Sequence, residues 1–131
     1  MRKRPLGKAL QTLLLALGAL AMGSLHAQPN VEQTTLEMEA GVDVPLSVFA
    51  AEGPVLVWLP SEHGLLPGHV FQAERLQAAG IEVWLPDPFA GYFLPTAPSS
   101  FDRIPTRLVP RLIEAGSRNG KRPVFVFGND R

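Results

Sequence analysis

The segment Val55-Leu56-Val57-Trp58-Leu59-Pro60 is a continuous apolar run that ends at a proline. Such a run between turn residues is typical of a strand that is covered on both faces of a sheet. Residues 61–68 form a loop with two glycines and a proline, and residues 69–79 place apolar side chains near helical spacing before Gly80. Residues 81–85 are a second strand-like run. This order predicts two parallel strands joined by a right-handed crossover.

A second helix and a last strand follow in the sequence. Pro86-Asp87-Pro88 ends the preceding strand, because proline cannot continue a strand ladder. Residues 89–100 are expected to form a long loop. Residues 107–115 have one apolar face and predict a helix, which Pro110 is expected to kink or shift. The run Val124-Phe125-Val126-Phe127 predicts a final buried strand.

The segment before the first crossover has a different pattern. Residues 31–39 alternate roughly between apolar and polar side chains, which indicates an exposed strand. Residues 44–51 predict a second strand, and Pro45 near its start suggests that this strand lies at an edge. Short turns connect these strands, so we expect antiparallel hairpins followed by parallel βαβαβ units. The predicted fold class is therefore α/β, in a single domain over residues 28–131.

The N-terminal segment has the three regions of a secretory signal peptide. Four basic residues open the chain, residues 13–22 are an uncharged apolar run, and small residues lead to Ala27. We expect cleavage after Ala27, with Gly23 as the alternative. The apolar run is shorter than the ~20 residues of a membrane-spanning helix. The sequence thus predicts a Sec-type signal peptide over residues 1–27, a periplasmic or secreted location and no stable membrane anchor after cleavage.

Composition excludes several classes of function. Removal of residues 1–27 leaves eight basic residues against twelve acidic ones, a formal charge of −4. The remaining basic residues form no sustained patch, so nucleic-acid binding is disfavoured. The chain has no cysteine, which excludes disulfides, thiolate metal sites, a cysteine nucleophile and a lipoprotein anchor. No group of His, Asp and Glu has metal-ligand spacing, and we expect neither a metal nor another cofactor.

The order of elements and several local motifs resemble the N-terminal half of an exported bacterial α/β-hydrolase-fold protein. Residues 55–60 resemble the third strand of that family, and His63-Gly64 lies where the family often has a His-Gly pair beside its oxyanion hole. Residues 76–87 resemble its helix A and fourth strand. Gly128-Asn129-Asp130-Arg131 resembles the start of the nucleophile elbow, Gly-x-Ser-x-Gly.

The resemblance implies roles for four residues and also shows a departure. Asp130 stands at the nucleophile position, where the dehalogenases and epoxide hydrolases of this family use aspartate instead of serine. His63, Gly64 and Leu65 would lie at the oxyanion hole, and the amides of the last two could donate to an oxyanion. The acid and histidine of the family follow the nucleophile in chain order, so both would lie beyond Arg131. The resemblance therefore implies a truncated chain that is inactive by itself.

The residues also allow simpler interpretations. Asp130 fits a turn or helix-capping residue, and His63 fits a polar residue of a loop. His69 is expected on the surface near the start of its helix. Asp87 is expected to accept hydrogen bonds in its loop. The aromatic residues Tyr92, Phe93 and Phe101 could line a pocket or cover the edge of the sheet.

Two hypotheses on function remain open at this point. The first is an exported α/β-hydrolase-like protein whose ancestral reaction is hydrolysis of an ester or similar small substrate. The second is a non-catalytic periplasmic protein that binds a ligand or a partner. The last strand exposes an apolar edge if no helix covers it, so we expect the chain to self-associate through that edge.

Overall fold

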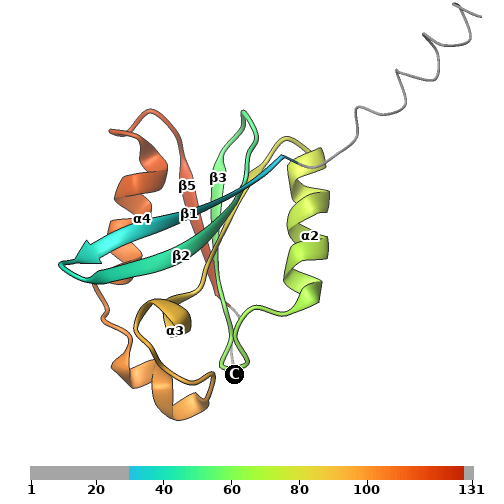
Figure 1. Ribbon diagram of the computed structural model, residues 1–131. Helices are drawn as coiled ribbons and strands as arrows, with labels where there is room; N and C mark the ends of the chain where they lie inside the picture. The colour runs from blue at the N-terminus through green and yellow to red at the C-terminus, as the bar shows by residue number, and fades with distance from the viewer. Residues whose placement is uncertain (1–29, 129–131) are drawn as a thin grey trace, which may run out of the picture.

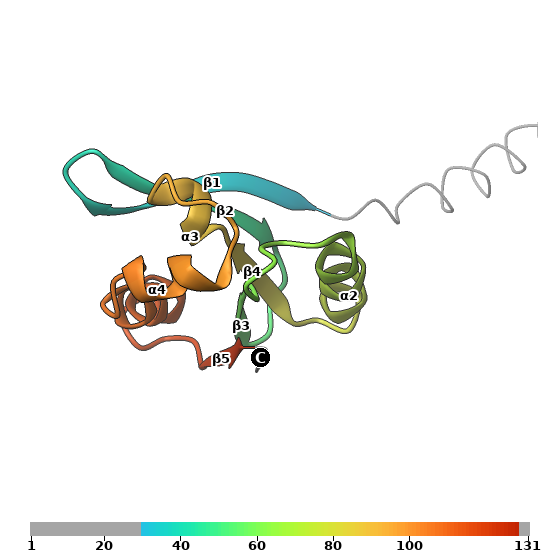
Figure 2. The same ribbon diagram turned by 90° about the horizontal axis from the view of Figure 1, so that it is seen from below.

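A computed structural model describes residues 30–128, which form one mixed sheet with helices on both faces (Figures 1 and 2). The elements follow in the order β1 (Val31–Glu39), β2 (Val42–Phe49), β3 (Val55–Leu59), α2 (Pro67–Ala78), β4 (Glu82–Pro86), α3 (Pro88–Gly91), the 3-10 helix η1 (Pro98–Arg103), α4 (Leu108–Ser117) and β5 (Val124–Gly128).

The sheet has five strands in the order β1-β2-β4-β3-β5. β2 pairs antiparallel with β1 and with β4, whereas β3 pairs parallel with β4 and with β5. The predicted fold class is thereby confirmed. Because β4 and β5 lie on opposite sides of β3, two crossovers of the same hand place α2 and α4 on opposite faces, as Figure 2 shows.

The expectation that Pro45 marks an edge strand is wrong, because β2 lies between β1 and β4. The β2–β4 ladder runs only from Leu46 to Phe49, and Pro45 lies just outside it. Its carbonyl still accepts a hydrogen bond from the Asp87 amide at 2.8 Å. Since the nitrogen and the carbonyl of one strand residue point the same way, the missing N–H faces the Asp87 carbonyl. That carbonyl accepts a hydrogen bond from the Gly91 amide at 3.1 Å instead.

The two faces of the sheet carry separate apolar clusters. On the face of α4, residues from β1 to β4 pack with Leu108 and Leu112. On the face of α2, Ala73 packs with Phe49, Val83 and Leu85. α2 lies mainly over β4 and β2, whereas α4 lies over β3, β5 and β1. The α2-side face of β3 and β5 is consequently the less covered part of the sheet.

Three local predictions need correction. The final strand was expected to be buried, but β5 is exposed from Phe125 to Gly128. The predicted loop over residues 89–100 contains α3 and the start of η1. Pro110 produces neither a kink nor a shift, since α4 begins at Leu108 and Pro110 lies in its first turn. Amides of the first turn have no acceptor within the helix, so a proline there removes no hydrogen bond.

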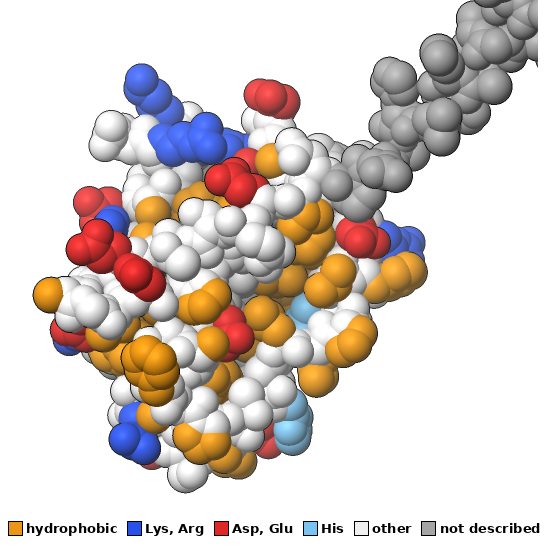
Figure 3. Space-filling model, viewed as in Figure 1, with side chains coloured by type: hydrophobic (Ala, Val, Ile, Leu, Met, Phe, Trp, Pro, Cys, Tyr) orange, Lys and Arg blue, Asp and Glu red, His pale blue; other side chains and the backbone are white. Residues whose placement is uncertain are grey.

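Charged and hydrophobic side chains are unevenly spread over the surface. In Figure 3 most charged side chains lie toward the top and left of the molecule, whereas hydrophobic side chains extend over α2 and the lower part. On α2 itself, Val70 and Phe71 are 42% and 57% exposed. This distribution is consistent with further contacts on the α2 side of the sheet.

Two predictions fall outside the residues that the structure describes. The signal peptide assigned to residues 1–27 is one, and the nucleophile-elbow position of Asp130 is the other. Among the helices that the structure describes, none has the length and apolar character to cross a membrane.

Candidate functional site

The carboxyl ends of the parallel strands form the first candidate site. Leu59, the last residue of β3, pairs with Gly128, the last residue of β5. The loop after β3 and the end of β5 therefore lie next to each other, as Figure 1 shows. Ligands of open α/β sheets bind beyond the carboxyl ends of the strands, so this is the position where chemistry is expected.

The loop after β3 is a tight turn. The Gly64 amide donates to the Ser61 carbonyl at 2.9 Å, and the His63 amide donates to the Ser61 hydroxyl at 3.3 Å. Gly64 has φ +74°, and a Cβ there would lie 2.8 Å from Cγ2 of Thr96. Glycine is thus required both by the backbone conformation and by the close approach of the Thr96 side chain.

The turn determines which amide could serve an oxyanion. The Gly64 amide is already bonded within the turn, whereas the Leu65 amide has no partner among residues 30–128. Leu65 is therefore the better placed of the two candidate donors. The His63 side chain is 71% exposed, and its Nε2 lies 3.6 Å from Oε1 of Glu62. Such an exposed pair contributes little to stability.

His69 is the residue that sequence reasoning placed wrongly. It was expected on the surface, but it is only 6% exposed. Its Nδ1 accepts a hydrogen bond from the Leu66 amide at 2.8 Å, which satisfies an unpaired donor at the start of α2. In the neutral ring this bond assigns the proton to Nε2. A side chain three residues after a helix start that bonds back to the chain is the signal that could have revealed this role.

The ring of His69 belongs to an aromatic group at the same end of the sheet. It packs edge-on against Trp58 of β3, with 5.0 Å between ring centroids, and Trp58 packs in the same way against Phe127 of β5 at 5.7 Å. The Trp58 indole nitrogen is buried without a hydrogen-bond partner among the described residues. A buried donor without an acceptor is costly, and a ligand oxygen could relieve it.

An apolar cavity of about 180 Å³ opens on the other face, at the same ends of β3 and β4. Its lining comes from β3 and the segments before and within α4, and comprises Leu59, Pro60, Pro88, Phe101, Ile104, Pro105, Thr106, Leu108 and Val109. Of the three aromatic residues considered for a pocket, Phe101 lines the cavity and Tyr92 packs against the core. Phe93 is 87% exposed.

Asp87 has a structural role next to this cavity. Its Oδ1 accepts a hydrogen bond from the Ala90 amide at 3.1 Å and so caps α3. The expectation that Asp87 accepts hydrogen bonds in its loop is confirmed. Its carboxylate stabilises the turn that leads from β4 toward the cavity.

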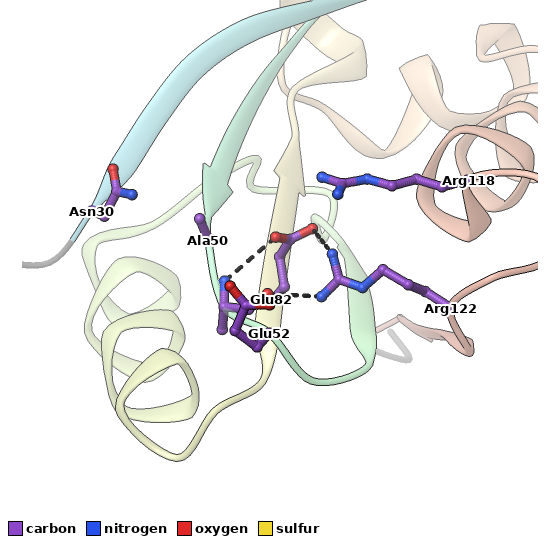
Figure 4. Close-up of a pocket in the computed structure, with 7 residues that line it drawn as sticks. Asn30, Ala50, Glu52, Glu82, Arg118 and Arg122 are labelled. Carbon is purple, nitrogen blue, oxygen red and sulfur yellow. Dashed lines mark hydrogen bonds and ion pairs between the residues drawn. The ribbon is translucent and has the colours of Figure 1, made fainter.

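The amino ends of the strands hold a second polar region, which Figure 4 shows in close-up. A cavity of about 480 Å³ there is lined by Asn30, Ala50, Ala51, Glu52, Glu82, Arg118 and Arg122. Oε2 of Glu82 accepts from Nη1 of Arg122 at 3.1 Å and from the Trp84 indole at 2.9 Å.

Arg122 completes this network by joining two loops. Its guanidinium also donates to the Ala51 carbonyl at 2.8 Å and to the Gly53 carbonyl. Glu82 is 3% exposed, and its second oxygen accepts weakly from the Ala51 amide at 3.4 Å. Because both charges are paired and hydrogen-bonded, this region acts as a structural clamp and not as a reactive centre. In residues 30–128, moreover, no group of three His, Asp or Glu side chains could hold a metal ion.

Comparisons with known proteins support the fold of this protein but assign no activity or site residue to it. No protein-family model and no curated protein matches this sequence. A crystal structure of a protein described as a dienelactone hydrolase from Klebsiella pneumoniae has a TM-score of 0.59 at 13% identity, over 77% of this chain and 50% of that one. A dienelactone hydrolase from Anabaena variabilis has a TM-score of 0.50 at 21% identity, over 79% of this chain and 53% of that one.

The chain thus spans about half the length of the solved structures that it matches. Identities of this size establish similarity of fold alone. The sheet of this protein resembles a partial α/β-hydrolase sheet, and that part of the sequence-based prediction is confirmed.

Proposed function

We propose that this protein is an exported α/β-hydrolase-like protein whose ancestral reaction is hydrolysis of an ester or a similar small substrate. One observation carries the proposal, namely the adjacent carboxyl ends of β3 and β5, with the Ser61–Gly64 turn directly beyond β3. The similar solved structures are named as hydrolases of a dienelactone, and a lactone is a cyclic ester.

The described residues would supply the binding side of such a site. The Leu65 amide would donate to the developing oxyanion, in the way that backbone amides stabilise the tetrahedral intermediate of acyl transfer. The apolar cavity next to Leu59 would receive an uncharged part of the substrate. Asp130 keeps its proposed place as the nucleophile, since a carboxylate can form an ester intermediate that water then hydrolyses.

Residues 30–128 show no histidine base that is oriented by an acid and directed toward a nucleophile. Within residues 30–128 no serine hydroxyl is hydrogen-bonded to a histidine ring, and His69 uses its Nδ1 to hold the Leu66 amide. We therefore propose that the described part of the chain binds substrate without turning it over at a substantial rate.

A hydrolysis assay tests this proposal. The full 131-residue chain, expressed in bacteria and purified, is assayed with p-nitrophenyl acetate beside its Asp130→Ala variant and beside a heat-denatured control. We expect equal, near-background rates from wild type and variant. Turnover that is lost in Asp130→Ala would show that the chain is a complete enzyme and would overturn the proposed inactivity.

The alternative of a non-catalytic binding protein is favoured by the apolar cavity, which could hold a small uncharged ligand without any chemistry. Replacing Val109 by a bulkier phenylalanine should fill the cavity. Loss of phenyl acetate binding in Val109→Phe, with no hydrolysis in wild type, would favour this alternative. Retained binding would place the ligand elsewhere.

Export is supported by the basic, apolar and small-residue regions of residues 1–27. We expect the mature protein to begin at Gln28 and to appear in the periplasmic fraction or the medium. Mass spectrometry of the purified protein measures this directly. A protein that retains Met1 and stays in the cytoplasm would contradict the proposal.

A further inference from the structure

The outer edge of β5 presents a set of backbone groups that nothing in residues 30–128 pairs with. The Val55 amide donates to the Pro123 carbonyl at 3.0 Å, so position 123 directs its polar groups toward β3. Since successive strand residues alternate, positions 125 and 127 also face β3. The amides and carbonyls of Val124, Val126 and Gly128 therefore point outward, away from the sheet.

Both faces of this strand are apolar and largely open. Val124 packs against the core on the α4 side, close to Gly116. Because side chains of a strand alternate between its two faces, Val126 lies on that face too. Phe127 contacts Trp58 on the opposite face, which Phe125 shares. The exposed fractions of Phe125, Val126 and Phe127 are 59%, 40% and 49%. Strands with apolar side chains on both faces are typical of a sheet interior.

The sequence of β5 is symmetric about Val126, with a phenylalanine on each side. If a second copy of β5 runs antiparallel with Val126 opposite Val126, then Val124 lies opposite Gly128. These are the residues with outward-facing amides and carbonyls, so each pair can exchange two hydrogen bonds. Phe125 then lies opposite Phe127 of the second copy in the non-hydrogen-bonded positions, where cross-strand side chains approach most closely.

Other registers fit less well. A pairing centred on Phe125 sets Phe127 opposite Pro123, and a pairing centred on Val124 leaves half of the strand without a partner. The register centred on Val126 alone pairs all the residues of Val124–Gly128 with one another and each aromatic ring with an aromatic ring. This self-complementarity points to a second copy of the chain as the occupant of the edge.

We propose that two copies of this protein associate through β5, antiparallel and in register about Val126, to form one continuous sheet. The dimer axis would run perpendicular to the sheet, so that α2 of both copies lies on one face and α4 of both copies on the other. This proposal is independent of the proposed function, because it uses no residue of the site beyond Phe127.

The chain has no cysteine, so a single introduced cysteine can form a disulfide only with the same residue of a second copy. Such variants therefore measure the register of the two β5 strands. In Val126→Cys the two α-carbons would lie ~5.5 Å apart, within the range of ~4.4–6.8 Å that a disulfide spans. In the control Val124→Cys the equivalent atoms would be offset by four residues, or roughly 13 Å at ~3.3 Å per residue. After mild oxidation of the full chain, we expect the disulfide-linked dimer in Val126→Cys and not in Val124→Cys.

A charge pair gives a second test that does not depend on oxidation. Val126→Lys and Val126→Glu each set like charges opposite each other, so each variant alone should be a monomer. A mixture of the two variants should form a heterodimer, measured by light scattering after gel filtration at about 50 μM. A wild-type monomer at that concentration, equal crosslinking of both cysteine variants, or failure of the mixture to associate would overturn the proposal.

Discussion

The two ends of the parallel strands differ in how their polar groups are satisfied. At the amino ends, the buried Glu82 and the partly buried Arg122 are paired with each other and bonded to the surrounding backbone. At the carboxyl ends, the Trp58 indole, the Tyr92 hydroxyl and the Leu65 amide have no hydrogen-bond partner among residues 30–128, and the first two groups are buried. The first end has the character of a stabilising network, whereas the second has groups available to a ligand.

The largest expected effect is at the amino ends. Arg122→Ala leaves the Glu82 carboxylate buried without its partner, and breaking a buried ion pair in this way costs about 3–5 kcal/mol. Urea unfolding measures the loss. Arg118→Ala is the matched control, because Arg118 lines the same cavity without an ion pair among residues 30–128 and should change stability by less than about 0.5 kcal/mol. Equal losses of unfolding free energy in the two variants would show that the ion pair of Arg122 with Glu82 does not stabilise the fold.

The next effect concerns the turn at the carboxyl ends. Gly64→Ala forces a side chain into a positive φ and toward Thr96, which should destabilise the fold by about 1–3 kcal/mol. Adding Thr96→Ser removes the Cγ2 atom that the new methyl group would meet and should recover part of the loss. Gly68→Ala is the control, since a Cβ there meets no atom within 4 Å and its φ is not positive. A tolerated Gly64→Ala would show that the turn is more adaptable than the geometry indicates.

The smallest effect is expected at Tyr92. Its hydroxyl is buried without a partner in the part of the chain that the structure describes, so Tyr92→Phe should be neutral or should stabilise the protein by up to about 1 kcal/mol.

Burial raises the pKa of the Tyr92 hydroxyl above its usual value of 10.0, while Arg107 lowers that pKa and Glu39 raises it. A raised folded-state pKa means that this group's contribution to stability is fully present below pH 10.0 and is lost as the pH rises through the folded-state pKa. Thermal unfolding between pH 9 and 11 should therefore show a steeper loss in wild type than in Tyr92→Phe. Identical slopes would contradict this assignment.

The order of strands and helices was predicted well because it depends on patterns between residues that are near each other in the sequence. The runs at residues 55–59 and 124–128 are apolar on both faces, and Gly80 ends the first crossover helix, so the βαβαβ order was readable. The position of β2 inside the sheet was not readable, because Pro45 lies just beyond the ladder that it was expected to break.

The candidate site was predictable in its place but not in its contacts. The loop with His63 and Gly64 was expected beyond β3, and it lies there. Burial of His69 and pairing of Glu82 with Arg122 depend on residues that are distant in sequence, 40 positions apart in the second case. Such long-range pairing has no periodic signal in a single sequence.

The two tryptophans of the chain report on the two ends of the strands. The Trp84 indole donates to Glu82 at the amino ends, and the Trp58 indole at the carboxyl ends has no partner among residues 30–128. A titration of the full ¹⁵N-labelled chain with phenyl acetate, followed through the two indole N–H resonances, is the most direct test of a site at the carboxyl ends. We predict that the Trp58 resonance shifts and the Trp84 resonance stays in place. A shift of the Trp84 resonance alone would contradict the account.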